Sequence, residues 1–188
     1  MPRLTQGEFR KAIDLGGEVI TGAMEDIFIT KRMIMREGIS EEKVNSYIRT
    51  KGKQYEAVYM EMSDKGFFQM MNKTSAKQIY KKKDEEANPA SKLPKYHWDI
   101  SDYDSLEYIR LMLNLIDNEI KRVERMKRAM LYSGADPDAV DKAIREVAVA
   151  SNEKAMKMTD EEAGQAMMER LNKRMENYQE FQEEYVDY

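Results

Sequence analysis

The chain has 188 residues, of which 41% are hydrophobic and 35% are charged, with a formal net charge of −4 at pH 7. This composition is apolar enough to build a core and argues against wholesale disorder. Because the chain has no cysteine, disulfides and thiolate metal sites are excluded. A membrane-spanning helix needs about 20 consecutive apolar residues, and no stretch of this chain approaches that length, so we expect no membrane partner.

Breakers are scarce, with 9 glycines and 4 prolines, and this favours helices. We predict an all-α fold of six or seven helices. Residues 1–83 carry 16 Lys/Arg and 11 Asp/Glu, a net charge of +5, whereas residues 84–188 carry 15 and 24, a net charge of −9. We therefore predict a basic N-terminal half (1–86) and an acidic C-terminal half (102–188) that pair electrostatically, within the chain or between copies.

In the N-terminal half, Thr5 and Glu8 form a capping box that begins the first helix. Gly16 and Gly17 each weaken a helix by about 1 kcal/mol relative to alanine, which predicts a break or kink there. A second helix should run from about residue 18 to 36 and end at Gly38.

Ser40 caps the next predicted helix, which we expect to end near Gly66. Another helix is predicted at about 74–86. Residues 87–101 hold two of the four prolines and lack helical periodicity, which predicts an extended connector. In the connector, Tyr96 and Trp98 are predicted to anchor the strand-like segment on a neighbouring helical groove.

The strongest pattern lies at about 102–133 and predicts one long central helix. Its apolar residues are separated alternately by three and four positions, as in a heptad seam. The seam should pack against helices of the same chain or of another copy, and we assign it to an oligomer or partner interface. Its residues are Leu106, Ile109, Leu113, Ile116, Ile120 and Val123.

Two further helices complete the chain. Asp136 and Pro137 should begin one, and Thr159 with Glu162 forms a capping box for the last, predicted at 160–184. The C-terminal segment combines acidic residues with aromatic ones. Its aromatic residues are predicted either to join the partner interface or to pack within the chain; those assigned to the interface are Tyr178, Phe181 and Tyr185.

Catalytic motifs can be tested by counting. His97 is the only histidine, no thiol is present, and no glycine-rich phosphate loop follows a strand pattern. The acidic clusters at 84–86 and 159–162 are explained by a neighbouring lysine run and by a helix start. We therefore expect no enzyme, no cofactor and no metal site.

The function we expect is a non-enzymatic structural or assembly subunit that contacts itself, other protein subunits, or both. The narrower expectation is a virus-particle component, such as a phage connector, collar or internal head protein. No individual residue supports this narrower expectation; it rests on how common such roles are among helical assembly proteins. The N-terminus lacks an uninterrupted apolar segment, so we expect a cytoplasmic location or a virus particle assembled there.

Nucleic-acid binding is the alternative function. Residues 40–83 hold ten Lys/Arg against five Asp/Glu, and phosphate contacts require little more than positioned positive charge. A regulatory or DNA-packaging factor would use this region. The predicted contacts are Lys77, Lys81, Lys82 and Lys83.

Overall fold

The computed structural model describes residues 6–71 and 105–184, with side chains at 14, 16–71 and 105–173. The described residues form helices and contain no strand, which confirms the predicted all-α fold. A short helical segment covers 64–71. The other helices are α1 (Gln6–Arg36), α2 (Glu41–Glu61), α4 (Ser105–Tyr132), α5 (Pro137–Lys157) and α6 (Asp160–Glu184).

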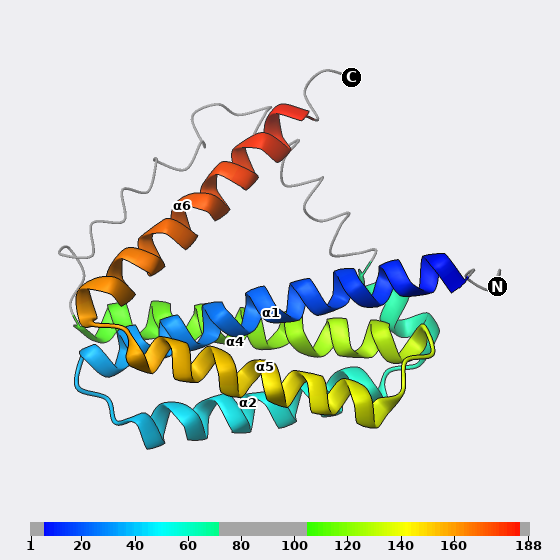
Figure 1. Ribbon diagram of the computed structural model, residues 1–188, viewed down its shortest axis with the longest axis horizontal. Helices are drawn as coiled ribbons and strands as arrows, with labels where there is room; N and C mark the ends of the chain where they lie inside the picture. The colour runs from blue at the N-terminus through cyan, green and yellow to red at the C-terminus, as the bar shows by residue number, and fades with distance from the viewer. Residues whose placement is uncertain (1–5, 72–104, 185–188) are drawn as a thin grey trace.

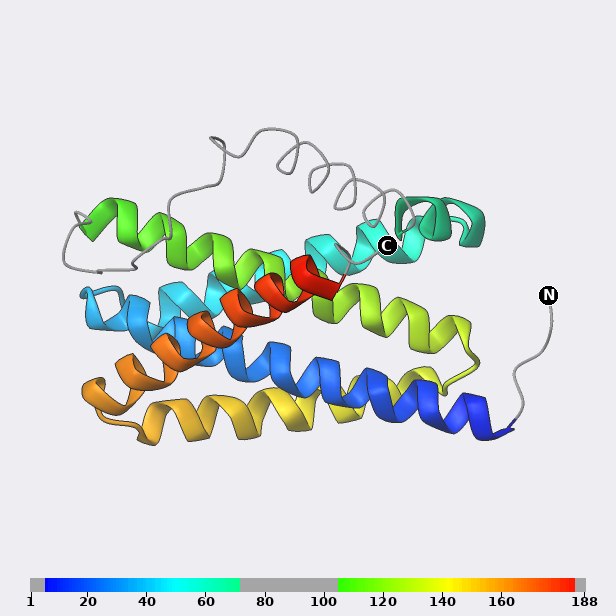
Figure 2. The ribbon, with the colours of Figure 1, turned by 90° about the horizontal axis from the view of Figure 1, so that it is seen from above.

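Four of these helices, α1, α2, α4 and α5, lie side by side, and α6 leaves them at an angle (Figure 1). Helix α1 packs most extensively on α4 and also contacts α5 and α6, while α2 packs mainly on α4. Seen from above, α6 crosses the bundle obliquely (Figure 2). Helices α2 and α4 run in the same direction, because Tyr55 contacts Asp117 and, further along both helices, Arg125 donates to the Tyr59 hydroxyl.

Helix α1 is continuous through Gly16 and Gly17, so of the predicted break or kink the break is wrong, and residues 18–36 do not form a separate helix. A Cβ atom placed on Gly16 would lie 3.0 Å from the Sδ atom of Met130 on α4, whereas one on Gly17 would meet no atom within 4 Å. The glycine at position 16 therefore lets α1 and α4 approach closely, and their packing outweighs its low helix propensity. Thr5, the predicted cap, lies outside the described residues.

The junction after α1 follows the prediction, whereas the end of α2 does not. Gly38 has φ +91° and ends α1, and Ser40 Oγ accepts a hydrogen bond from the amide of Lys43. Helix α2 ends at Glu61 rather than near Gly66. The prediction is wrong because Ser63 caps the next helical segment: its Oγ accepts from the amide of Gly66 at 3.1 Å.

The predicted end of the central helix at Gly134 and the predicted starts of the last two helices are confirmed. Gly134, with φ +95°, follows α4, and Asp136 accepts from the amide of Ala139 at the start of α5. At the start of α6, the Thr159 amide donates to Glu162 Oε2 at 2.8 Å and the Glu162 amide donates to Thr159 Oγ1 at 3.1 Å. Both bonds of a capping box are present.

The core lies mainly between α1 and α4. Ile27 and Ile34 of α1 are buried together with Ile116, Ile120 and Val123 of α4. Burying an aliphatic side chain of this size contributes about 1.5–3 kcal/mol, so this interface accounts for much of the driving force for folding. The centre of the heptad seam thus packs within the chain.

Candidate functional site

The described residues enclose no cavity of ligand size. One hollow lies between α1, α4 and α6, a second lies between α1, α5 and α6, and each has room for about one water molecule. The same residues contain no group of three or more histidine, aspartate or glutamate side chains placed so that they could hold a metal ion. No described helix is long and apolar enough to cross a membrane. The polar chemistry of the described residues lies instead in charged contacts between helices.

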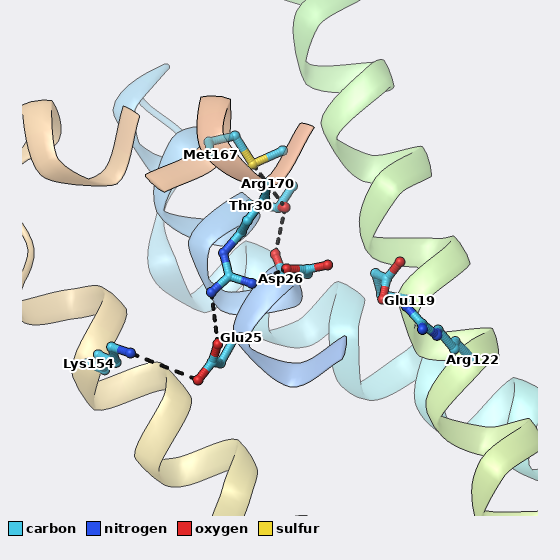
Figure 3. A network of polar contacts seen from close by, with 8 residues as sticks. All are labelled: Glu25, Asp26, Thr30, Glu119, Arg122, Lys154, Met167 and Arg170. Atoms are coloured by element: carbon cyan, nitrogen blue, oxygen red, sulfur yellow. Dashed lines mark hydrogen bonds and ion pairs between the residues drawn. The ribbon is translucent and has the colours of Figure 1, made fainter. Parts of the chain in front are cut away.

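One set of contacts attaches α6 to the bundle and is drawn in Figure 3. Arg170 donates from Nη2 to Glu25 Oε2 at 2.8 Å and from Nη1 to Asp26. Thr30 Oγ1 donates to the Asp26 carbonyl at 2.6 Å and approaches the Met167 Sδ atom at 3.7 Å. One guanidinium therefore bridges two adjacent carboxylates of α1, which fixes the base of α6 in position and orientation.

Beyond this attachment, α6 separates from the other described helices. Ala163, Met167 and Leu171 are buried and lie on one face of the helix. Helix α6 rises at an angle to the other four helices (Figure 1). On α1, one turn before Asp26, Gly22 has open space beside it. We call residues 174–184 of α6 the distal arm.

A buried lysine joins three helices. Lys31 of α1 is 0% exposed and donates to Glu41 Oε1 at 2.9 Å and to Asn152 Oδ1 at 2.7 Å. The hydrogen bond from Lys31, together with its charge, lowers the pKa of Glu41. Because a buried ammonium must be paired, this contact fixes the register of α1 against α2 and α5.

A second buried lysine lies at the other end of the bundle. Lys127 Nζ of α4 is 2.8 Å from Glu56 Oε1 of α2 and 2.6 Å from Asp141 Oδ1 of α5. Glu124 lies one turn away, and burial raises its pKa to about 7. Three carboxyl groups therefore face one ammonium, and the most buried of them holds its proton near neutral pH.

These ion pairs bear on the predicted pairing of a basic with an acidic half. Among the described residues, most ion pairs between the two halves join a cation of the C-terminal half to a carboxylate of the N-terminal half. Examples are Lys127–Glu56 and Arg170–Glu25. Only a minority run in the other direction, as in Arg32–Asp160. The internal pairs therefore leave the charge excess of each half unneutralised.

The exposed side of the α2–α4 interface combines tyrosines with cations. Lys51 Nζ lies 5.8 Å from the Tyr47 ring centre and 6.0 Å from that of Tyr55. Lys121 Nζ lies 5.1 Å from the Tyr55 ring centre, and Arg125 lies over Tyr59. We call this set the tyrosine–cation seam; it comprises Tyr47, Lys51, Tyr55, Tyr59, Asp117, Lys121 and Arg125.

Asp117 is the one carboxylate of this seam. Both of its oxygens accept from the Tyr55 hydroxyl at 2.8 Å, and Lys121 Nζ lies 3.2 Å from Oδ2. Burial, followed by the hydrogen bond to Asp117 and its charge, raises the pKa of Tyr55. The phenol thus stays a donor, and the seam keeps an excess of positive charge.

The residues predicted to form an interface differ in their surroundings. Ile116, Ile120 and Val123 are buried within the chain and offer no surface to a partner in this fold. Ile109 and Leu113 are half-buried, and Leu106 is 56% exposed. Tyr178 and Phe181 belong to α6, although their side chains are outside the described set. The remaining predicted site residues lie outside the described residues: Tyr185, Tyr96, Trp98, His97, Lys77, Lys81, Lys82 and Lys83.

Sequence reasoning missed the two buried lysines. Lys31 carries no local signal, since lysine on a helix is ordinarily solvated. Lys127 does carry a local signal, because it follows Val123 by four residues and so occupies a heptad-seam position that should be apolar. A charged residue at a core position indicates a buried ion pair or a register-fixing contact.

Comparison of the chain with protein-family models, with curated proteins and with solved structures finds no match. The function is therefore argued from the charges, contacts and shape described above.

Proposed function

We propose that the protein is a non-enzymatic assembly subunit that binds copies of itself, or other subunits, through helical surfaces. The observation that carries the proposal is the course of α6, which is attached at its base by Arg170 and then leaves the bundle (Figure 1). A helix that projects in this way is suited to enter a groove or lie along a helix of another subunit.

The amino-acid pattern of the distal arm supports this role. Helical spacing places Met175 and Tyr178 on the same face as Leu171, which is buried against the bundle. The apolar stripe of α6 thus continues past the point where α1 covers it. Glu176, Glu180, Glu183 and Glu184 fall on the opposite face. An amphipathic helix of this kind gains stability when its apolar face is covered.

The test is the molar mass of the full chain, measured by size-exclusion chromatography with light scattering. We expect an oligomer whose mass falls towards that of the 22.1-kDa monomer when Tyr178 and Phe181 are replaced by alanine. The control variant, Asn177→Ala with Gln179→Ala, changes the same turns away from the apolar face and should keep the oligomer. A mass that the first variant leaves unchanged would remove the arm from assembly.

A further inference from the structure

The tyrosine–cation seam joins α2 to α4 through Asp117, and the side chains of its lysines remain partly exposed among the described residues. Its side chains differ in exposure: Tyr59 is buried, whereas the side chains of Lys51 and Lys121 are each 30% exposed. Four aligned positions of α2, four residues apart, contribute three aromatic rings and a lysine. Tyr47 and Tyr55 of this ridge are half-buried and lie beside Lys51, so flat apolar area and positive charge occur together, which suits an acidic, aromatic partner.

The positive charge extends along α4 beyond the seam. Arg110 is exposed and lies two helical turns before Asp117, on the same side of the helix. From Arg110 to Arg125, this side carries three cations against two carboxyl groups, those of Asp117 and Glu124. The charge of Asp117 is shared with Lys121 and the Tyr55 hydroxyl, and burial raises the pKa of Glu124 to about 7. A carboxylate-bearing helix placed here would meet unbalanced positive charge along about four turns.

We propose that the tyrosine–cation seam binds the distal arm of a second copy of this chain, which rests on the assembly role proposed above. The distal arm carries four glutamates and one arginine, a net charge of −3, with Tyr178 and Phe181 among them. Its charge and its aromatic content both complement the seam. Reciprocal exchange of two arms between two seams would close a two-fold dimer.

The geometry favours an arm supplied by another copy. Helix α6 rises from the side of the layer opposite α2, so the arm of the same chain points away from α2 (Figure 1). Arg170 bridges Glu25 and Asp26 at the base of α6 and holds that direction. To reach its own seam, the helix would have to break this attachment or bend around α4.

A nucleic acid fits the seam less well than an acidic helix does. Single strands bind through bases stacked on open aromatic faces. Here Lys51 and Lys121 lie over the Tyr55 ring, and Arg125 lies over Tyr59, so the ring faces are occupied by the protein's own cations. Carboxylates can bind these cations from the solvent side without displacing them from the rings.

The test is a charge exchange between arm and seam. The seam variant is Arg110→Glu with Arg125→Glu, and the arm variant is Glu180→Lys with Glu184→Lys. Each alone should self-associate about tenfold more weakly than the wild type in sedimentation velocity, because like charges then face each other. An equimolar mixture should regain the wild-type mass, since reversed arms now face reversed seams. Far-ultraviolet circular dichroism of each variant checks that it is folded.

The control changes charge equally elsewhere. Arg145→Glu with Lys157→Glu alters two exposed residues of α5 and should leave self-association unchanged. If the arm variant dissociates while the seam variant associates like the wild type, the arm functions in assembly but the seam is not its site. If the mixture fails to regain mass, or if the wild type is monomeric throughout, the inference is overturned. Tight binding of a labelled single-stranded DNA 20-mer that the seam variant loses would assign the seam to nucleic acid instead.

Discussion

Glu124 on α4 should make the stability of the bundle depend on pH. Its carboxyl group is half-buried, and this burial raises its pKa from 4.5 to about 7. Lys127 acts in the opposite direction, while the carboxylates of Glu56 and Asp141 add to the increase. The folded protein therefore keeps a proton on Glu124 at pH values where the unfolded chain has lost it.

The sign and size of the effect follow from this difference. Stability falls as the pH rises from about 4.5 through 7, because the unfolded state binds fewer protons there, and it levels off about one pH unit above 7. Each unit of pKa corresponds to about 1.36 kcal/mol, which sets an upper limit of about 3 kcal/mol. Glu124 retains contact with water, so we expect about 1–2 kcal/mol.

The assay is urea unfolding of Glu124→Gln and of the wild type at pH 5 and pH 8. The glutamine resembles the protonated acid, so the two proteins should be about equally stable at pH 5, and the variant should be more stable by about 1–2 kcal/mol at pH 8. The control is Glu153→Gln, at an exposed position of α5. Its free energy of unfolding should differ from that of the wild type by the same amount at both pH values. A Glu124→Gln difference that does not change with pH would refute the reasoning.

Three further predictions concern packing and caps. Arg170→Ala should speed amide hydrogen exchange in the first turns of α6, because two carboxylates of α1 lose their shared partner at a cost of about 1–3 kcal/mol; Lys173→Ala is the exposed control, and equal exchange in both would contradict the attachment. Gly17→Ala should raise the free energy of unfolding by about 1 kcal/mol, because alanine has the higher helix propensity and no atom lies in its way. Gly16→Ala should be less stable than Gly17→Ala, because its added methyl group would contact Met130. Equal gains of the two variants in thermal melts would contradict the close approach of α1 and α4 at Gly16. Ser63→Ala should cost about 1 kcal/mol by removing the cap of the 64–71 segment, and an unchanged urea midpoint would show that the cap is unimportant.

Local sequence signals predicted the helix ends well where the determinants are local. Gly38 and Gly134 adopt positive φ, and Thr159 with Glu162 makes both capping-box bonds. These features depend on four or five consecutive residues, so they can be read from the chain itself.

The errors arise where a distant helix decides the outcome. The break at Gly16 is absent because α4, more than a hundred residues away in sequence, packs against that glycine. Helix α2 ends before Gly66 because Ser63, three residues earlier, caps the next helical segment. Tertiary packing overrode propensity in the first case, and a competing local signal prevailed in the second.

The candidate interaction site was only partly predictable. The acidic and aromatic character of residues 174–184 is visible in the sequence, and so is the heptad seam around Ile116. Which side of α4 faces α1, and which faces α2, depends on the packing of all the helices. The tyrosine–cation seam therefore appears only when Tyr55 and Lys121, far apart in the chain, are brought together.

The most direct test of assembly through the arm and the seam is the mass of the unmodified chain as a function of concentration and salt. We predict, by sedimentation velocity, a dimer at micromolar concentration and low ionic strength that shifts towards the 22.1-kDa monomer at high salt, because the contact pairs opposite charges. A chain that remains a 22.1-kDa monomer at every concentration in low salt would contradict the account.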